Sequence, residues 1–445
     1  MPFWMQADLR HSRMMKTYLF LALAAWFGVS AEAGEPVPMA KPSVASAWIQ
    51  LGPGGGADVR AITSAARCPA AVVDGKDVAM APRAVADASF LLTCSAALPA
   101  GAKSAGVADI HLTVPVADPQ RILVLGDTGC RIKGAALQAC NDPVAWPFAG
   151  LAKAAAGLKP DLIIHLGDYL YRESPCPAGN AGCAGSPYGD NWAAWNADFF
   201  APAAPLLAAA PWIVIRGNHE DCYRAGPGFL RMLGPVAYDP AAPCNAHLDP
   251  YAVMAGNQWV AVMDSASASD TDLDPKAVAT YEKDFESLKA IANTGNGHEL
   301  WLTTHRPIWA AITGPLGLPI GGSINLIQAT GDLSAFKAIS LMLSGHIHAF
   351  EVLNYSGRNA PPPQIVAGHG GDNLDTTPLD LHGTLFQGHS GVGVKDGLSI
   401  RGFGFLMMTR TPGSEGWSIQ LYDSAGVPGA QCQFEMGRVF CLKPK

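Results

Sequence analysis

Short apolar segments alternate with helical segments along the middle of this chain. The segments RILVLGD (121–127), DLIIHLGD (161–168) and PWIVIRGNHE (211–220) have the uninterrupted apolar runs of buried strands. Residues 143–158 and 193–210, which lie between them, are predicted to be mainly helical. Strands that alternate with helices form βαβ units, so this part of the chain is predicted to be an α/β domain.

The second half of the chain continues this pattern and then departs from it. A helix is predicted where Val278, Tyr281, Phe285 and Leu288 fall on one face. Strands are predicted at 258–264, 299–305, 339–348, 363–370, 402–408 and 417–423. Little helix separates the last four strands, so we expect that half of the sheet to be mixed or antiparallel. Residues 381–399 are predicted to be a glycine-rich loop.

The N-terminal region is predicted to have three parts. Basic residues precede the apolar run 18–29, and Ala31 and Ala33 have cleavage-site spacing, so residues 1–33 are predicted to be a signal peptide. The alternatives are an uncleaved anchor and a true start at Met15. Residues 34–45 are predicted to be a linker, and the short apolar segments of 46–118 predict a small all-β domain.

Composition and cysteines support an exported, folded protein. Hydrophobic residues make up 49% of the chain and charged residues 15%, which favours a buried core over disorder. The ten cysteines form no CxxC pair, so in an oxidising compartment, secreted or periplasmic, we expect disulfides rather than zinc. Pairing neighbours predicts the bonds 68–94, 130–140, 176–183, 222–244 and 432–441, although other connectivities stay open. The sequence contains no Lys/Arg-rich block, so we expect no nucleic-acid-binding surface.

Five apolar runs end in Asp, Asn or His. These strand ends are GDTG (126–129), GDYLY (167–171), GNHE (217–220), TTHRP (303–307) and GHIH (345–348). Ligand sites assemble at strand ends in open α/β sheets. A succession of His and carboxylate side chains at such ends predicts a metal site.

The order and spacing of these motifs resemble those of the calcineurin-like metallophosphoesterases and, within them, the purple acid phosphatases. The resemblance covers roughly residues 120–410. It implies that residues 119–445 form an αββα sandwich of two mixed sheets. It also implies that residues 46–118 correspond in placement to a β-sandwich-like accessory domain.

The resemblance further implies a site with two metal ions. The implied ligands are Asp127, Tyr171 and His348 for one ion, Asn218, His305 and His346 for the other, and Asp168 as the bridge between them. A carboxylate can hold two cations about 3.5–4 Å apart with its two oxygens, as two-metal phosphoester sites require. His346 and His348, at i and i+2, would share one side of an extended segment.

Gly129 and Tyr171 mark a specific branch of the resembling family. Most calcineurin-like enzymes have a histidine two residues after the first aspartate, where this chain has Gly129. The purple acid phosphatases make the same exchange and place a tyrosine where Tyr171 lies. A phenol of pKa about 10 ionises at acid pH only when a strongly acidic cation holds it. The pattern therefore predicts Fe(III) in the first site, with Zn, Fe(II) or Mn in the second.

Several further residues carry predictions with open alternatives. The resemblance places His219 toward the substrate, as the group that protonates the leaving alcohol or stabilises the phosphoryl group. Glu220 either orients a neighbour or is a first-turn helix acid. His165 is interpreted as a packing residue or as support for the metal ligands. A further substrate-side histidine of many purple acid phosphatases is missing from 308–315. His369 and His389 lie in glycine-rich loops and are candidates to replace it, with ordinary loop histidines as the favoured alternative.

The predicted function is phosphomonoester hydrolysis by attack of a metal-bound hydroxide in an exported enzyme. The alternative is a phosphodiesterase or nucleotide hydrolase that uses the same two-metal site. A further alternative is an exported binding protein that has lost catalysis. The expected partner is a small-molecule phosphoester, with no membrane span after signal cleavage; the sequence does not predict the oligomeric state.

Overall fold

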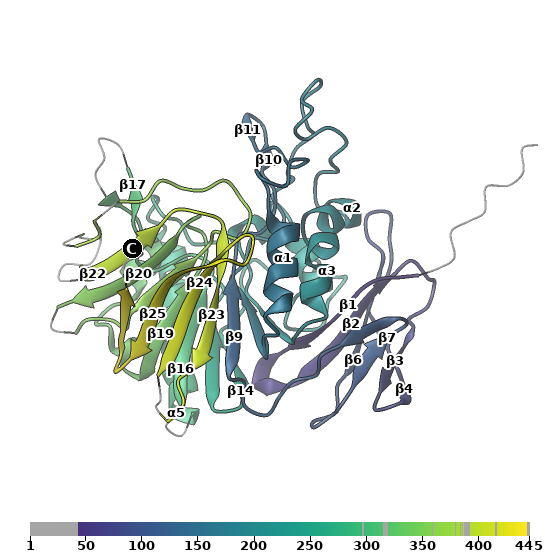
Figure 1. The fold of residues 1–445 in the computed structure, drawn as a ribbon, viewed down its shortest axis with the longest axis horizontal. Coiled ribbons are helices and arrows are strands. Elements are labelled where there is room, and N and C mark those ends of the chain that lie inside the picture. Colours follow the sequence, from purple (N-terminus) through teal and green to yellow (C-terminus); the bar gives the residue numbers. More distant parts are fainter. Residues whose placement is uncertain are drawn as a thin grey trace, which may run out of the picture. The chain divides into compact units, whose positions relative to one another are not determined.

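Figure 1 shows the computed structural model of the chain, which describes residues 43–295, 298–314, 319–357, 359–378, 380–382, 384, 386, 392–413 and 416–442. The predicted signal peptide (1–33) and most of the predicted linker (34–45) lie outside these residues, as does His389.

One large sheet of the described chain carries the first three predicted strands at its centre. Its strand order is β26 (Arg438–Leu442), β25 (Pro428–Glu435), β24 (Trp417–Asp423), β23 (Gly404–Arg410), β9 (Arg121–Leu125), β12 (Leu162–His165), β13 (Trp212–Val214), β1 (Val44–Leu51), β2 (Ala57–Thr63), β6 (Leu92–Ala97) and β5 (Ala81–Ala84). The strands β9, β12, β13 and β1 are parallel, and the strands on either side of this group pair antiparallel. Three predicted strand ends therefore meet at one edge.

A second sheet carries the remaining predicted motif strands. Its order is β14 (Tyr251–Ala255), β15 (Gln258–Val262), β16 (Glu299–Thr304), β19 (Ile339–Ser344), β21 (Gln364–Ala367), β20 (Phe350–Ser356) and β22 (Gly393–Ile400). β15, β16, β19 and β21 are parallel, whereas β14, β20 and β22 are antiparallel to their neighbours. The expectation of mixed pairing in the second half of the chain is confirmed.

The two sheets pack face to face through alternate residues of their strands. Ile122 and Val124 of β9 lie in a core shared with Leu341 and Leu343 of β19. Leu123, between them, points to the opposite face and packs under helices. This period of two explains why the apolar runs are continuous: both faces of each central strand are buried.

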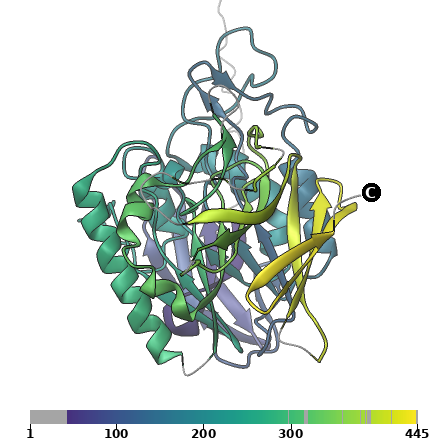
Figure 2. The same ribbon diagram turned by 90° about the vertical axis from the view of Figure 1, so that its left-hand side faces the viewer.

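Helices cover the outer face of each sheet, so the predicted αββα sandwich is confirmed. On the first sheet lie α1 (Phe148–Gly157), α2 (Trp192–Trp195), the π-helix η2 (Asn196–Phe200), α3 (Ala201–Leu207) and α4 (Gly226–Met232). On the second lie α5 (Pro275–Thr294), α6 (Ile324–Ala329) and the 3-10 helix η5 (Ser334–Ala338). Figure 2 shows α5 running along one side of the molecule. Its buried residues include all four that were predicted from their spacing.

The N-terminal region consists of strands, as predicted, and part of it joins the first sheet. Besides β1, β2, β5 and β6, a four-stranded sheet is formed by β4 (Lys76–Ala79), β3 (Ala70–Val73), β7 (Ala105–Val107) and β8 (Ile110–Leu112), with η1 (Pro53–Gly55) between β1 and β2. Both groups contribute to one apolar cluster, as in a sandwich. Gln50 of β1 pairs in parallel with Trp212 of β13. The assignment of residues 46–118 as an accessory domain stays a prediction.

All five predicted disulfides are confirmed. The bonds are Cys68–Cys94, Cys130–Cys140, Cys176–Cys183, Cys222–Cys244 and Cys432–Cys441. None of the ten cysteines is free, a pattern typical of oxidising compartments. Two of the bonds hold the loops around the hairpin β10 (Ile132–Lys133) and β11 (Ala136–Leu137), which projects from the sandwich in Figure 1.

Some local predictions were wrong. The predicted loop 381–399 contains much of strand β22, because its residues complete the edge beside β20. Strands β20 and β25 were not predicted, since polar residues interrupt them, and β26, which has only five residues, was not predicted either. A small hairpin, β17 (Ile312–Thr313) with β18 (Pro319–Ile320), was missed as well. Among the described residues, no helix is both long and apolar enough to span a bilayer.

Candidate metal centre

The seven predicted ligand residues come together where the carboxyl ends of the strands of both sheets meet. Asp127, Asp168 and Asn218 follow β9, β12 and β13 of the first sheet. His305 follows β16, and His346 and His348 follow β19, in the second. Tyr171 reaches the same place from the loop after Asp168. The site therefore depends on the packing of one sheet against the other.

Three of these residues have left-handed backbone conformations. The φ angles are +56° at Asp127, +57° at Asp168 and +71° at His346. Positive φ is uncommon outside glycine, although Asp and His tolerate it better than most residues, and strain of this kind clusters at functional sites. Each residue follows a buried strand within three residues, so the turn redirects its side chain into the site.

Tyr171 lies at the centre of the first group of ligand atoms. Its Oη lies 2.8 Å from Asp168 Oδ2, 3.0 Å from Asp127 Oδ1 and 3.1 Å from His348 Nε2. An octahedral ion with bonds of about 2.0–2.2 Å holds neighbouring ligand atoms about 3 Å apart. These three spacings therefore match the edges of a coordination polyhedron.

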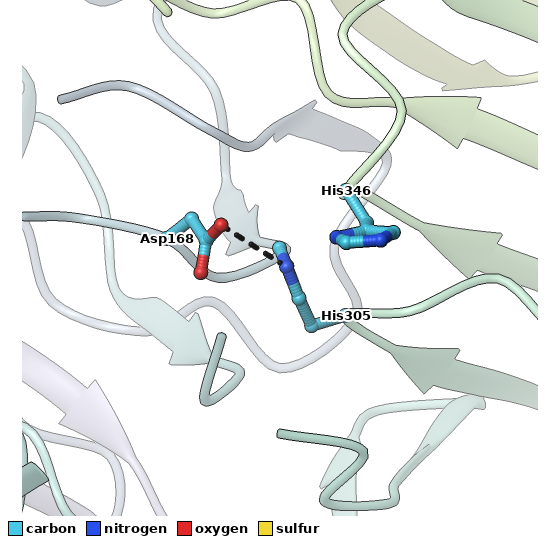
Figure 3. Close-up of side chains that lie close together, drawn as sticks. All are labelled: Asp168, His305 and His346. Atoms are coloured by element: carbon cyan, nitrogen blue, oxygen red, sulfur yellow. Dashed lines mark ion pairs between the residues drawn. The ribbon is translucent and has the colours of Figure 1, made fainter. Parts of the chain in front are cut away.

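His305 lies at the centre of the second group. Its Nε2 lies 2.9 Å from Asn218 Oδ1 and 3.2 Å from Asp168 Oδ2. Asp168, His305 and His346 offer ligand atoms that all lie within 4.8 Å of one another. Figure 3 shows these three side chains converging from separate segments. Because Asp168 Oδ2 also contacts Tyr171, one carboxylate belongs to both groups.

Each of the three histidines uses one ring nitrogen to contact the protein. His305 Nδ1 lies 2.8 Å from the Leu166 carbonyl, and His348 Nδ1 lies 2.7 Å from the Asn373 carbonyl. A carbonyl only accepts, so these Nδ1 atoms donate and leave the Nε2 lone pairs for the cluster. His346 Nε2 lies 2.8 Å from Asp270 Oδ2 and equally close to Arg306 Nη1. Donation to Asp270 leaves Nδ1 to bind, and metal-ligating histidines show this arrangement.

The charges of the site call for cations. The lone pair of His305 Nε2 faces the oxygens of Asn218 and Asp168, which are themselves acceptors. Burial would lower the pKa of His305, but the Asp168 carboxylate outweighs it and raises the pKa to about 9. Burial, with the Asp127 and Asp168 carboxylates, raises the pKa of Tyr171 well above its ordinary value. The donor atoms are carboxylate, amide and phenol oxygens and imidazole nitrogens. Such a set fits metal ions, which would replace the protons that the raised pKa values keep on His305 and Tyr171.

The exchange of histidine for Gly129 has a steric cause in the structure. A Cβ at position 129 would lie 2.8 Å from Tyr171 Cδ2, 2.8 Å from the Tyr169 carbonyl oxygen and 2.9 Å from Asp198 Oδ2. The tyrosine ring fills the space that a side chain at 129 would need. Gly129 and Tyr171 are therefore one structural feature.

Glu220 fixes the two turns that carry Asp168 and Asn218. Its carboxylate accepts hydrogen bonds from the backbone N–H groups of Asp168, Tyr169, Leu170 and Gly217. Burial and the Asp168 carboxylate raise its pKa to about 8. The structure supports both alternatives raised for Glu220: it orients these turns, and it is an acidic residue in the first turn of the 3-10 helix η3 (Asn218–Glu220).

His219 faces the site with a carboxylate behind it. Its Nδ1 lies 2.6 Å from Glu173 Oε1, and its Nε2 lies 3.9 Å from Asp168 Oδ2. Its backbone N–H donates to Asp168 Oδ1 at 2.8 Å. The segment was expected to be extended, but Asn218–Glu220 form the 3-10 turn η3, because Glu220 caps the preceding Gly217. The bend after β19 likewise corrects the extended segment expected at His346 and His348.

Other predictions concern His165 and His369. His165 stacks on Tyr169 with ring centroids 4.0 Å apart, which confirms the packing role. Its Nε2 lies 3.0 Å from Thr128 Oγ1, next to Asp127 in sequence, and support for the metal ligands stays a prediction. His369 is buried, and its ring nitrogens have no hydrogen-bond partner among the described residues. It does not line the cavity described below, so it does not replace the missing substrate-side histidine.

Sequence reasoning missed the carboxylates that support the ligands. Asp270 contacts His346, Glu173 contacts His219, and Asp372 lies 3.6 Å from His348 Nδ1. Glu173 lies only two residues after Tyr171, which could have indicated it. Asp270 and Asp372 come from separate loops, and no local signal marks them.

A cavity of about 320 Å³ opens over the two groups of ligand atoms. Asp168, Tyr171, Asn218, His219, His346 and His348 all line it. Its cationic lining residues are Arg131, Lys133 and Arg224, and Pro307, Ile312 and Ile347 give it an apolar part. The cavity has room for a small substrate directly above the predicted ligands.

Comparisons with known proteins agree with this geometry. The profile of the calcineurin-like phosphoesterase family matches residues 120–350, more than half of the chain. The structure is similar to purple acid phosphatase PPD1 from yellow lupin (Lupinus luteus) seeds, with a TM-score of 0.51 and 13% identity over 90% of this chain and 74% of that one.

It is also similar to PhoD, with a TM-score of 0.51 and 11% identity over 90% of this chain and 92% of that one. At this identity both likenesses concern the fold. No curated protein sequence gave a significant match. The family match, which includes every strand end of the site, shows that the chain belongs to the calcineurin-like phosphoesterase family.

Proposed function

We propose that this protein is an exported phosphatase that hydrolyses small phosphomonoesters at a site with two metal ions. Membership of the family implies a metal-dependent phosphoester hydrolase. The proposal adds the two ions, the ligand roles, the monoester substrate and export. The observation that carries it is that two groups of ligand atoms share Asp168 Oδ2.

In this proposal Asp127, Tyr171 and His348 hold one ion, Asn218, His305 and His346 hold the other, and Asp168 bridges them. The phenol of Tyr171 among these oxygen ligands supports Fe(III) in the first position. The amide of Asn218 is neutral, which supports a divalent ion, Zn, Fe(II) or Mn, in the second. When bound, the ions would supply an activated water as nucleophile and neutralise charge on the phosphoryl group.

Two further residues would assist the reaction: His219 protonates the leaving group, and Glu220 orients the metal ligands. Glu173 contacts His219 Nδ1, and His219 Nε2 lies 3.9 Å from Asp168 Oδ2, on the side of the proposed metal ligands. A proton held there can pass to the departing alcohol oxygen, which then leaves as a neutral alcohol. Glu220 holds the backbone turns that present Asp168 and Asn218 and so keeps the two groups of ligands in register.

The test is metal analysis of purified protein followed by a phosphoester panel from acid to alkaline pH. We expect two metal ions per chain, one of them iron, and hydrolysis of monoesters ahead of diesters and nucleotides. Asp168→Asn should lose both activity and bound metal. Preference for diesters would favour the phosphodiesterase alternative, and full metal binding without hydrolysis of any phosphoester would favour the binding protein.

A further inference from the structure

Arg131 lies on the face of the Tyr171 ring. Its guanidinium carbon is 4.8 Å from the ring centroid, a distance at which a cation interacts with an aromatic face. The side chain is 22% exposed and lines the cavity. No part of the proposed function so far uses this residue.

A buried residue, Asp372, joins Arg131 to His348 through its carboxylate and to Asp127 through its backbone N–H. Arg131 Nε donates to Asp372 Oδ1 at 3.2 Å, and Nη2 donates to Oδ2 of the same carboxylate. Asp372 is fully buried, and its Oδ2 lies 3.6 Å from His348 Nδ1. The Asp372 N–H donates to the Asp127 carbonyl at 3.0 Å. A bidentate pair of this kind fixes orientation as well as charge.

The placement of Arg131 beside Tyr171 is fixed by the backbone. Buried Asp198 accepts from the Cys130 N–H at 3.1 Å and from the Tyr171 N–H at 2.8 Å. The Cys130–Cys140 disulfide closes the loop that carries Arg131, and the Arg131 N–H donates to Gln138 Oε1 at 3.0 Å. One side chain, Asp198, therefore holds both segments in register.

We propose that Arg131 is a positioning residue that stabilises anionic Tyr171 as a metal ligand and, through Asp372, holds His348 and Asp127 in place. This inference rests on the proposed function for the two-metal site. A positive charge over a phenolate lowers the energy of its electrons. Charge transfer from the phenolate to Fe(III) then needs more energy, and the Tyr171 hydroxyl loses its proton to an incoming cation at less cost.

The experiment compares Arg131→Gln with Lys133→Gln, which removes one positive charge from the same cavity. Lys133 Nζ pairs with Glu173 Oε2 at 3.0 Å, and among the described residues the cation over the Tyr171 ring is Arg131. In iron-loaded protein, Arg131→Gln should move the visible band to longer wavelength, and Lys133→Gln should leave it in place. In metal-free protein titrated with Zn(II) against a chelator, Arg131→Gln should weaken one of the two affinities by about 10–100-fold. Tyr171→Phe should weaken the same one.

Arg131→Lys keeps the positive charge but loses the bidentate pair with Asp372. Its visible band should therefore stay close to that of the wild type, whereas its zinc affinity should fall below that of the wild type. Far-UV circular dichroism of each variant confirms folding. If Arg131→Gln and Lys133→Gln give the same band and the same zinc affinities, the inference is wrong. If iron-loaded wild type has no visible band, the iron assignment fails instead, and the zinc titration alone decides the role of Arg131.

Discussion

At the residue scale, Asp168 defines the site. Its side chain contacts Tyr171, His305 and the His219 backbone, and its own N–H is held by Glu220. Burial would raise its pKa, but His305 and His219 keep it well below its usual range, so the carboxylate is ionised. A buried anion with contacts on both sides is suited to joining two cations.

Tyr171→Phe tests the phenolate ligand. The variant keeps the ring that packs against Gly129 and loses only the oxygen. We expect it to lose the visible colour of the iron-loaded protein and to weaken iron binding, because phenylalanine offers no donor. Absorption spectra and iron content of matched preparations measure this. A variant that keeps the wild-type band would show that the colour arises elsewhere.

His219→Ala tests the proposed acid. Catalysis by a general acid contributes roughly 10²–10⁴-fold to rate, so kcat should fall within that range for substrates with poor leaving groups. The fall should be smaller for good leaving groups, which need little protonation. Both metals should stay bound. Glu173→Gln should show the same dependence on the leaving group with a smaller loss, because the histidine remains but is less well oriented.

Kinetics with a series of aryl and alkyl phosphates, together with metal content, provide the measurement. Equal slowing across the series, or loss of a metal in His219→Ala, would contradict the assignment of His219 as the acid.

Glu351 predicts a pH dependence of stability. Burial raises its pKa to about 8, and only one of its oxygens has a hydrogen-bond partner among the described residues. A carboxyl with a raised folded-state pKa contributes stability below its unfolded pKa of about 4.3, and that stability is lost as pH rises toward 8. We expect the loss to be on the order of a few kcal/mol.

Glu351→Gln should remove the loss of stability that ionisation of Glu351 causes as pH rises, because glutamine does not ionise. The variant should still fold, since its amide oxygen can accept from the Ala311 N–H. Chemical unfolding of wild type and variant at pH 5 and pH 9 measures it. Glu286→Gln is the control, because Glu286 is 70% exposed on α5. An equal loss with pH in wild type and Glu351→Gln would show that other groups cause it.

At the element scale, the site is a set of strand ends, and this explains what the sequence could predict. Asp127, Asp168, Asn218, His305, His346 and His348 each follow a buried strand, so the chain alone predicted that these side chains would gather at strand ends. Their roles as metal ligands came from the family resemblance and stay a proposal. Asp270, Asp372 and the contact of Arg131 with Tyr171 were not predicted. These side chains meet the ligands from loops distant in sequence, and local pattern does not show which loops meet.

Gly129→Ala tests the close packing of one turn against the next. The new methyl group would meet Tyr171 Cδ2 and the Tyr169 carbonyl at 2.8 Å, closer than such atoms approach. We expect destabilisation of about 1–3 kcal/mol and weaker metal binding. Gly157→Ala, near the end of α1, is the control, because nothing lies within 4 Å of its added Cβ. Equal stability and metal content in the two variants would refute this account of Gly129.

At the scale of the whole molecule, strand pairing differed most from what the sequence indicated. The alternation of strands and helices predicted an α/β domain, and the family resemblance implied the αββα sandwich. Neither predicted that β1 would pair with β13, because an apolar strand carries no local signal for its partner. The disulfides were predictable because each joins cysteines that are neighbours in sequence.

Export makes a prediction for the whole chain. Peptide mapping without reduction should recover the five disulfide-linked peptide pairs and no free thiol. Reduction should weaken metal binding as well as stability, because the Cys130–Cys140 bond closes the loop that carries Arg131. Several free thiols in protein isolated from its natural compartment would contradict both the pairing and the export.

The most direct test of the two-metal site is a crystal structure of the metal-loaded protein with anomalous scattering measured at the iron and zinc edges. We predict two cations about 3.5–4 Å apart, with Asp168 bound to both. Iron should contact Asp127, Tyr171 and His348, and the second ion should contact Asn218, His305 and His346. A single cation, or a pair in which neither ion contacts Tyr171, would contradict the proposal.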